Sequence, residues 1–261
     1  AGPVSHRTAQ VTNLPWSINA DSLQQQFNIA HVELINDFAA IGYGIDCLQQ
    51  QDFVDLQAGH ALDKATRVVI GAGTGLGEGY LVWQDGGYVP LPSEGGHADF
   101  APASEVQMNL LGYLQARFGH VSYERVVSGM GLVNIYDFLA CNQPASIKLQ
   151  QALLDGDDPA AIIAEFAMEK NEAVAVQALD IFIECYGAQA GNLALTCLAR
   201  GGVYIAGGIA PKIMQRMQQG DFMRAFCNKG RFASLMQALP VKVIMNPEVG
   251  LHGAIRVALR S

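Results

Sequence analysis

The sequence contains no apolar run near the roughly 18–20 residues that a membrane-spanning helix requires. Its first residues, Ala-Gly-Pro-Val-Ser-His, have neither the basic start nor the apolar core of a signal peptide. We therefore expect no membrane association. The chain starts with alanine rather than methionine. We expect that it begins inside a longer native protein, with N-terminal processing as the alternative.

Cysteine is scarce and scattered. The residues are odd in number, lie far apart and form no Cys-x-x-Cys pair, which argues against a zinc site and a dithiol redox centre. A reducing cytoplasm is the expected compartment. The five cysteines are Cys47, Cys141, Cys185, Cys197 and Cys227.

Basic residues are outnumbered, since 16 Lys and Arg stand against 24 Asp and Glu and the net charge is −8. No cluster of Lys or Arg is dense enough to form a cationic stripe, so nucleic acid is not an expected partner. Half of the 261 residues are hydrophobic, which is enough for one large core or two smaller ones. We expect one or two domains.

Apolar runs typical of strands are interleaved with helical patterns, which predicts a mixed α/β fold. Between 80 and 91 apolar residues alternate on both sides of Asp85-Gly-Gly87, which predicts a hairpin. Helices are expected from 104 to about 119 and over most of 159–198. The expected strands are 32–35, 68–71, 79–83, 88–91, 203–206 and 241–245.

Two polar residues, Asn36 and Asp37, follow the apolar run at 32–35. Asp37 would then lie at the carboxyl end of a strand, where open α/β sheets bind ligands. The amide of Asn36 suits a ligand hydroxyl. The alternative is a turn or a helix cap, because Asn and Asp are common at both.

A glycine-rich segment, Gly71-Ala-Gly-Thr-Gly-Leu-Gly77, directly follows another apolar run. Backbone N–H groups around Gly73 and Gly75 could converge on phosphate there, with the Thr74 hydroxyl as a further donor. The segment is not a P-loop, since no Gly-Lys-Ser/Thr follows, and not a dinucleotide fingerprint, since the next segment predicts a hairpin. A tight turn between two strands is the alternative.

Glu94 and His97 lie in Glu-Gly-Gly-His, on the loop after the hairpin, and neither has an evident structural partner in the sequence. They either bind a polar ligand or form a polar loop in which His97 bonds to backbone. A metal site at His97 and Asp99 is not expected, because the spacing suggests no third ligand. Glu124 is expected at the start of a helix, where the helix dipole alone would favour it.

The segment Gly201-Gly-Val-Tyr-Ile-Ala-Gly-Gly-Ile209 predicts a buried strand between two glycine pairs. The chain would turn sharply at both ends with its backbone exposed. Near Gly207, Gly208 and Ile209 this suits a slot for adenine or ribose. A plain strand with tight ends is the competing interpretation.

Six segments, taken in this order and spacing, resemble bacterial ATP-dependent glucokinases of the hexokinase-like superfamily. A related family, the repressor-type sugar kinases, carries a Cys-rich zinc motif after its Glu/Gly/His segment, and that motif is absent here. The six segments are Ile-Asn-Asp-Phe at 35–38, Gly-Ala-Gly-Thr-Gly-Leu-Gly at 71–77, Glu-Gly-Gly-His-Ala-Asp-Phe-Ala-Pro at 94–102, Glu-Arg-Val-Val-Ser-Gly at 124–129, Gly-Val-Tyr-Ile-Ala-Gly-Gly-Ile at 202–209 and Lys-Gly-Arg-Phe at 229–232.

The resemblance implies an actin-like ATPase (ribonuclease H-like) α/β fold of two domains with the site in the cleft between them. It implies glucose and ATP as ligands, Mg²⁺ carried by the nucleotide, no metal bound by the protein alone, and a homodimer. By the same resemblance Asp37 is the catalytic base. The glucose-binding residues it implies are Asn36, Asp37, Glu94, His97 and Glu124, and the ATP-binding residues are Gly73, Thr74, Gly75, Gly207, Gly208 and Ile209.

One family segment, the Asp-x-Gly-Gly-Thr turn that contacts phosphate and helps to place Mg²⁺, does not occur in the sequence. We therefore expect a small domain incomplete at its N-terminus, formed by 1–45 and about 240–261, and a large domain of 46–239. Hinges are expected near 40–44 and 238–243. The implied reaction is phosphorylation of glucose at its 6-hydroxyl, with weak sugar binding and little turnover by the chain as it stands. A non-catalytic sugar-binding fragment or regulator, and a kinase for another hexose, are the alternatives.

Overall fold

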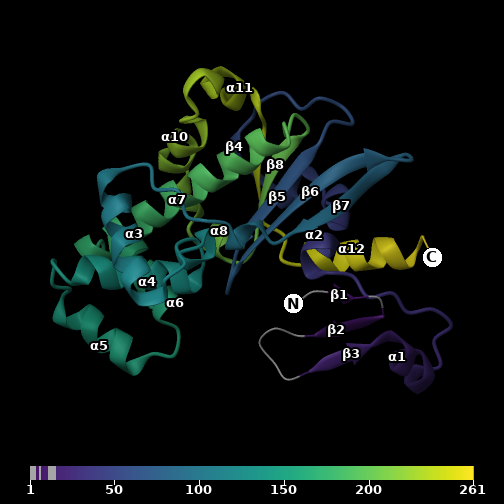
Figure 1. The fold of residues 1–261 in the computed structure, drawn as a ribbon, viewed down its shortest axis with the longest axis horizontal. Helices are drawn as coiled ribbons and strands as arrows, with labels where there is room; N and C mark the ends of the chain where they lie inside the picture. Colours follow the sequence, from purple (N-terminus) through teal and green to yellow (C-terminus); the bar gives the residue numbers. More distant parts are fainter. Residues whose placement is uncertain (1–3, 6, 11–15, 261) are drawn as a thin grey trace.

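The computed structural model describes residues 4–5, 7–10 and 16–260, and its centre is a six-stranded sheet (Figure 1). The strand order is β4-β9-β8-β5-β6-β7. β5, β8 and β9 are parallel to one another, whereas the other three strands run antiparallel to their neighbours. The strands are β4 (Phe53–Gln57), β5 (Arg67–Ala72), β6 (Leu76–Gln84), β7 (Gly87–Ser93), β8 (Gly202–Ala206) and β9 (Val241–Ile244).

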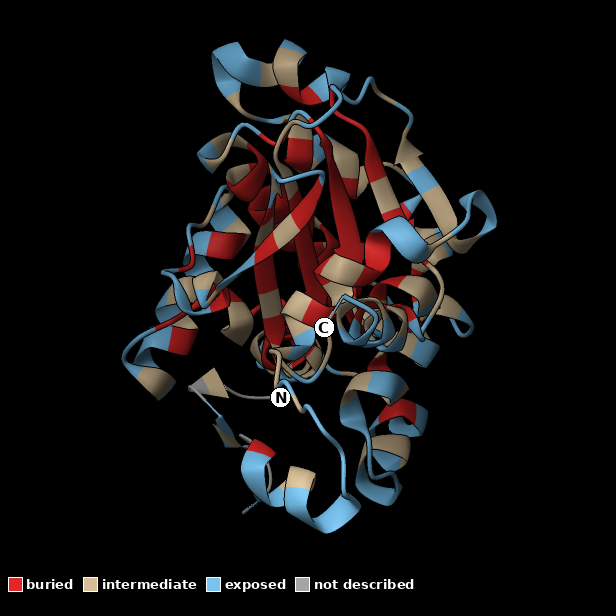
Figure 2. Cartoon of the chain, turned by 90° about the vertical axis from the view of Figure 1, so that its right-hand side faces the viewer, coloured by how far each residue is buried: buried red, intermediate tan, exposed pale blue. Residues whose placement is uncertain are grey.

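Both faces of this sheet are covered by helices. A central strand contributes to the core on each face, because its successive side chains point to opposite sides. In β5, Val68 and Ile70 belong to the larger core and Val69 to a smaller core on the other face. Figure 2 shows the buried strands in red in the interior. The larger core is built on α7 (Ala173–Thr196), and the helices around it are α3 (Glu105–Phe118), α4 (Gly129–Ala140), α6 (Pro159–Met168) and α10 (Asp221–Cys227). The smaller core lies under α2 (Asp37–Gly44) and α12 (Val249–Ala258).

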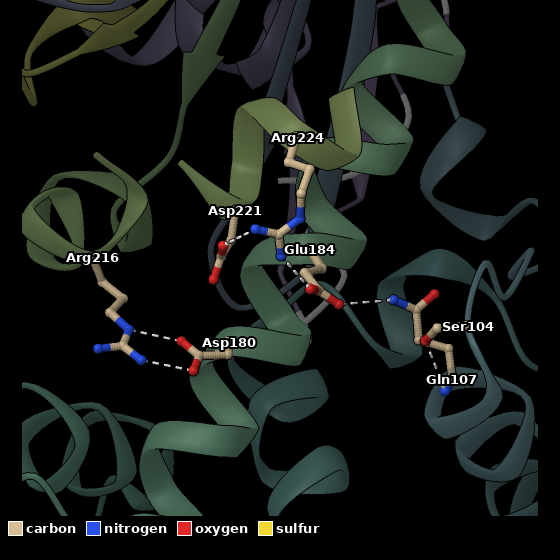
Figure 3. Close-up of polar contacts among 7 residues, drawn as sticks. All are labelled: Ser104, Gln107, Asp180, Glu184, Arg216, Asp221 and Arg224. Atoms are coloured by element: carbon tan, nitrogen blue, oxygen red, sulfur yellow. Dashed lines mark hydrogen bonds and ion pairs between the residues drawn. The ribbon is translucent and has the colours of Figure 1, made fainter. Parts of the chain in front are cut away.

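Polar contacts hold the surrounding helices against α7 (Figure 3). Asp180 accepts two hydrogen bonds of 2.7 Å from Arg216 on α9 (Met214–Met217). One turn further along α7, Glu184 accepts hydrogen bonds from Arg224 of α10 at 2.9 Å and from Gln107 of α3 at 3.4 Å. A two-pronged Arg–carboxylate contact fixes direction as well as distance. α7 is thus the element against which the neighbouring helices are aligned.

A second, three-stranded sheet precedes α2, and in the described residues it shares no ladder with the large sheet. It is followed by α1 (Ala20–Phe27), whose first turn is capped by the Asn19 side chain, which accepts from the Ser22 N–H at 2.9 Å. Residues 28–36 then lead to α2. The strands of this sheet are β1 (Val4–Ser5), β2 (Thr8–Gln10) and β3 (Ser17–Asn19).

The structure confirms most expected elements and corrects one. The strands expected at 68–71, 79–83, 88–91, 203–206 and 241–245 are present as β5 to β9. The strand expected at 32–35 is wrong, because that run has no ladder partner among the described residues and lies beside α12, where Ile35 and Val257 line one pocket. The helical region 159–198 is two helices, since Asn171 adopts a left-handed φ of 51° between α6 and α7.

The remaining helices are short and lie between the elements already described. They are α5 (Ile147–Asp155), α8 (Ile209–Lys212) and α11 (Ala233–Ala238). β9 pairs with β8 and β4 inside the large sheet, and 40–44 is the C-terminal half of α2. The division into two domains with hinges near these positions stays a prediction.

Candidate active site

Asp37 is the first residue of α2 and is exposed, so it does not end a strand as expected. Asn36 is the helix N-cap, because its Oδ1 accepts from the N–H groups of Phe38 at 2.9 Å and Ala39 at 3.1 Å. The cap was the alternative interpretation of this dipeptide. These two hydrogen bonds use the side-chain oxygen of Asn36, and its side-chain NH₂ group takes no part in them.

Phe38 attaches the start of α2 to the glycine-rich segment. A Cβ on Gly77 would lie 2.1 Å from Cε2 of the Phe38 ring, and one on Gly71 would lie 2.9 Å from its Cζ. Real side chains cannot approach that closely, so only glycine at these positions lets the ring lie flat on the hairpin. The Asn-Asp-Phe and glycine-rich segments are thereby brought together, with Asp37 beside them.

The glycine-rich segment is the tight turn between β5 and β6. The Gly73 N–H donates to the Gly75 carbonyl at 2.8 Å, and the Gly73 carbonyl accepts from the Gly129 N–H at the start of α4, also at 2.8 Å. Thr74 is exposed at the tip, and nothing lies within 4 Å of a Cβ built on Gly73. The space beside Gly73 is therefore open to a ligand, whereas its own N–H and carbonyl are already hydrogen-bonded within the protein.

Glu124 lies directly against this turn. Its Oε2 accepts from the Leu76 N–H at 2.9 Å, and a Cβ on Gly75 would approach the same oxygen to 2.5 Å. Glu124 lies in the first turn of a short 3₁₀ helix, Tyr123–Arg125, as expected of a helix start, whereas the longer helix α4 begins only at Gly129. Its position is set by backbone contact rather than by a helix dipole.

His97 lies between Glu94 and Glu124. Its Nε2 lies 3.9 Å from Oε2 of Glu94, and its Nδ1 lies 3.9 Å from Oε1 of Glu124. Both separations are longer than a direct hydrogen bond. The loop can approach β6 this closely because residue 96 is glycine. A Cβ at that position would lie only 2.2 Å from the Leu76 carbonyl oxygen. Glu94 and His97 are well exposed, with 78% and 60% of their side chains accessible.

The turn after β8 lies beside the end of β5. Gly207 has a φ of 82°, and a Cβ there would be 2.4 Å from the Ala72 carbonyl oxygen. Gly208 is exposed with nothing within 4 Å of a Cβ, and Ile209 starts α8. Four of the segments singled out in the sequence therefore meet around 72–77.

Two buried residues at this point were not found from the sequence. The Tyr186 hydroxyl of α7 accepts from the Ala72 N–H at 3.0 Å and lies 3.4 Å from the Ala206 carbonyl, so it joins the ends of β5 and β8. Burial raises the pKa of this phenol. Glu78 of β6 is also buried. Tyr186 looks like any core aromatic in an apolar helix, whereas a glutamate amid the apolar residues of β6 is a signal that could have been read.

Within the described part of the chain no group of three or more His, Cys, Asp or Glu is placed to hold a metal ion. No helix among the described residues is both long and apolar enough to cross a membrane.

Comparison with known proteins gives a consistent result. The model of the family described as Glucokinase matches residues 1–261. A glucokinase of Nostoc punctiforme is 48% identical over 274 aligned residues, covering 100% of this chain and 80% of the relative. A glucokinase of Synechocystis is 45% identical, with 100% and 78% covered.

Solved structures agree with this match. A glucokinase from an Antarctic psychrotroph superposes with a TM-score of 0.85 at 31% identity, covering 100% of this chain and 79% of the other. A Balamuthia mandrillaris glucokinase in complex with glucose gives 0.84 at 24%, covering 99% of this chain and 76% of that one. The expected actin-like α/β fold is confirmed by this likeness.

Proposed function

The chain belongs to the glucokinase family, and from that premise we propose that it transfers the γ-phosphoryl group of Mg-ATP to the 6-hydroxyl of glucose. The observation that carries the proposal is the meeting of the Asn-Asp-Phe, glycine-rich, Glu-Gly-Gly-His and Glu124 segments around 72–77. These segments are distant in sequence, so their convergence supports one shared site.

Glu94, His97 and Glu124 are the proposed sugar-binding residues, with Asn36 contributing its free NH₂ group. Two carboxylates and an imidazole offer directional partners to adjacent hydroxyls of a polyol. The gaps of 3.9 Å around His97 are too long for direct bonds, which supports a ligand oxygen as the common partner.

The proposed nucleotide contacts are backbone groups. The phosphates of Mg-ATP would lie over the turn of Gly73, Thr74 and Gly75. The N–H groups of Thr74 and Gly75 are the candidate donors, because the Gly73 N–H already donates to the Gly75 carbonyl. Gly207, Gly208 and Ile209 would border adenosine. Exposed N–H groups in tight glycine turns are effective anion partners. The magnesium ion enters with the nucleotide as part of the substrate.

Asp37 is the proposed base. As the sugar O6 forms its bond to the γ-phosphorus, the bond from phosphorus to the β-γ bridging oxygen breaks and ADP leaves with that electron pair. The O6 proton passes to the Asp37 carboxylate. Such reactions depend mainly on positioning and on stabilisation of spread negative charge, with a modest part for the base.

The test is an Asp37→Asn variant, with Asp85→Asn on the distant hairpin as control. Asp37→Asn should lower kcat by about 10²–10⁴-fold, because a positioned base contributes that much, while glucose affinity stays within a few-fold. Asp85 has a φ of 50°, which Asn tolerates, so the control should keep full activity. A variant within tenfold of wild type removes Asp37 from this role. Because the Asp-x-Gly-Gly-Thr segment does not occur in the sequence, wild-type turnover is expected to be low, and both variants are compared with that low rate. Glucose binding without any phosphoryl transfer by the wild type would favour a sugar-binding protein instead.

A further inference from the structure

Glu78 is a carboxylic acid in the interior of the protein. It lies on β6 with 1% of its surface accessible. Its Oε1 accepts from the Gln189 side-chain NH₂ of α7 at 2.8 Å. Its Oε2 is buried as well and, within the described residues, has no hydrogen-bond partner. A buried polar atom without a partner is costly and calls for an explanation.

The unpartnered oxygen lies directly against the loop of Glu94 and His97. A Cβ on Gly95 would be 2.1 Å from Oε2 of Glu78. Ser93, which is the cross-strand neighbour of Glu78, accepts from the Gly95 N–H at 3.0 Å through its hydroxyl. Gly95 therefore packs directly against the carboxyl of Glu78.

The same hydrogen-bonded chain reaches the Glu124 segment. Asn192, one turn beyond Gln189 on α7, donates to the Gln189 side-chain oxygen at 3.2 Å and to the Tyr123 hydroxyl at 3.0 Å. The Tyr123 N–H in turn donates to the Ala98 carbonyl at 3.0 Å. Lys229 ends the chain, with its ammonium 2.8 Å from Oδ1 of Asn192. One buried row of amides on α7 thus supports both segments that carry the proposed sugar contacts.

The surroundings of Glu78 favour the uncharged form of its carboxyl. Burial raises its pKa, against the smaller opposing effect of the Gln189 hydrogen bond. Its titratable neighbours are phenols, Tyr80 on its own strand, Tyr123 on the 3₁₀ turn and Tyr186 on α7, and burial raises the pKa of each of these. None of them offers a positive charge to a carboxylate at this position.

We propose that Glu78 is a positioning residue of the sugar site: its carboxyl, held by Gln189, supports Gly95 and so sets where Glu94 and His97 lie. The ligand named here rests on the proposed function, whereas the support of the loop does not. Glu78 touches no substrate in this arrangement and acts through the backbone of the loop.

The experiment compares Glu78→Ala with Glu78→Gln in the full chain. Glutamine keeps the shape of the side chain and the acceptor for Gln189, whereas alanine removes the support. Without sugar, amide exchange of 94–98 should become about tenfold faster in Glu78→Ala and stay unchanged in Glu78→Gln. The Val241–Ile244 strand is the internal control and should keep its protection in both. With ligands, Glu78→Ala should raise the glucose KM about tenfold, with the ATP KM unchanged.

A second pair of variants tests the contact itself. Gly95→Ala alone should loosen the loop, because its methyl group meets Oε2 of Glu78, whereas the same change in the Glu78→Ala background should restore protection by filling the vacated space. Such non-additivity is expected only of residues in contact. The proposal is overturned if the amide exchange rates of 94–98 are unchanged in Glu78→Ala. It is also overturned if 94–98 and β9 lose protection against exchange equally. A wild type that binds no glucose while the loop still responds would refute the proposed function and leave the positioning role standing.

Discussion

The residues of the proposed sugar site differ in how far a sequence can reveal them. Glu94, His97 and Glu124 stand in polar, glycine-containing loops, where a ligand role is one of the obvious interpretations. Glu78 is a more hidden case, since its burial and its contact with Gly95 depend on the packing of α7 against β6. A one-dimensional pattern predicts which residues can bind, and the tertiary contacts decide which residues hold them in place.

The raised pKa of Glu78 predicts a pH-dependent stability. A carboxyl whose pKa is higher in the folded than in the unfolded chain stabilises the fold fully below about pH 4.3, the unfolded value. That contribution is lost as the pH rises through the folded value. Glu78→Gln has no such loss, so its free energy of unfolding minus that of wild type should increase with pH above about 4.3. Urea unfolding at several pH values measures this.

Glu94→Gln is the control for that series. Its side chain is mostly exposed, so this substitution removes a carboxyl at the surface and leaves the interior unchanged. A difference between Glu78→Gln and wild type that does not change with pH would show that Glu78 is ionised in the folded protein at no cost.

Gly75 provides a second test at the residue scale. A methyl group there would meet Oε2 of Glu124, which is fixed by the Leu76 N–H, so Gly75→Ala should displace Glu124. We expect glucose affinity to fall by about 10–100-fold, because the loss of a hydrogen bond to a carboxylate costs about 1.5–3 kcal/mol. Gly73→Ala is the matched control, since nothing lies within 4 Å of its Cβ, and its glucose affinity measured by calorimetry should be unchanged. Equal losses in both would contradict a specific Glu124 contact.

At the scale of elements, α2 and α12 pack backbone to backbone. A Cβ on Gly44 would be 2.0 Å from the Val249 carbonyl oxygen, and one on Gly253 would be 1.8 Å from the Ala40 carbonyl oxygen. Arg256 adds hydrogen bonds of 3.2 Å to the Tyr43 carbonyl and to Asp46. The start of α2, which carries Asp37, is therefore tied to the C-terminal helix.

Gly253→Ala should separate these two helices. A methyl group at 1.8 Å from a carbonyl oxygen forces backbone movement, and overpacking of this kind costs about 1–3 kcal/mol. Gly250→Ala on the same helix is the control, because its Cβ would meet only Ile41 at an ordinary 3.8 Å. That change should be neutral or slightly stabilising, since alanine is the better helix former. Thermal unfolding of both variants decides, and equal melting temperatures would contradict the close contact.

The elements show why sequence patterns succeed and fail. β5 and β8 are found from their apolar runs because both faces of a central strand are buried and every side chain must be apolar. The run at 32–35, Val-Glu-Leu-Ile, is also mainly apolar, but it pairs with no strand among the described residues, and Ile35 lines a pocket with residues of α12 instead. β4 is missed because an edge strand such as Phe53-Val-Asp-Leu-Gln is only partly buried and its pattern is weak. Composition predicts burial, and the partner decides between strand and extended loop.

At the scale of the whole molecule, the described chain contains two sheets with no shared ladder. The proposed sugar contacts Glu94, His97 and Glu124 belong to the part built on the large sheet, and Asp37 follows the segment that leads from the small one. Phosphoryl transfer needs water to be excluded while the two substrates are in line, and kinases commonly achieve this by closing two parts of the structure around them. Closure on sugar binding is the corresponding prediction.

Glucose should therefore make the protein more compact. Small-angle scattering at saturating glucose should give a smaller radius of gyration than the ligand-free protein, because the two parts approach when the hydroxyls join the carboxylates of the site. Glu124→Gln is the matched control: at the glucose concentration that saturates wild type it should bind less and contract less, and further glucose should restore the contraction. The midpoint of the scattering change should coincide with the calorimetric dissociation constant in both proteins. Saturated wild type with an unchanged radius would show that the site is already closed without sugar, and the positions of Asp37 and His97 would then be those of the reacting state.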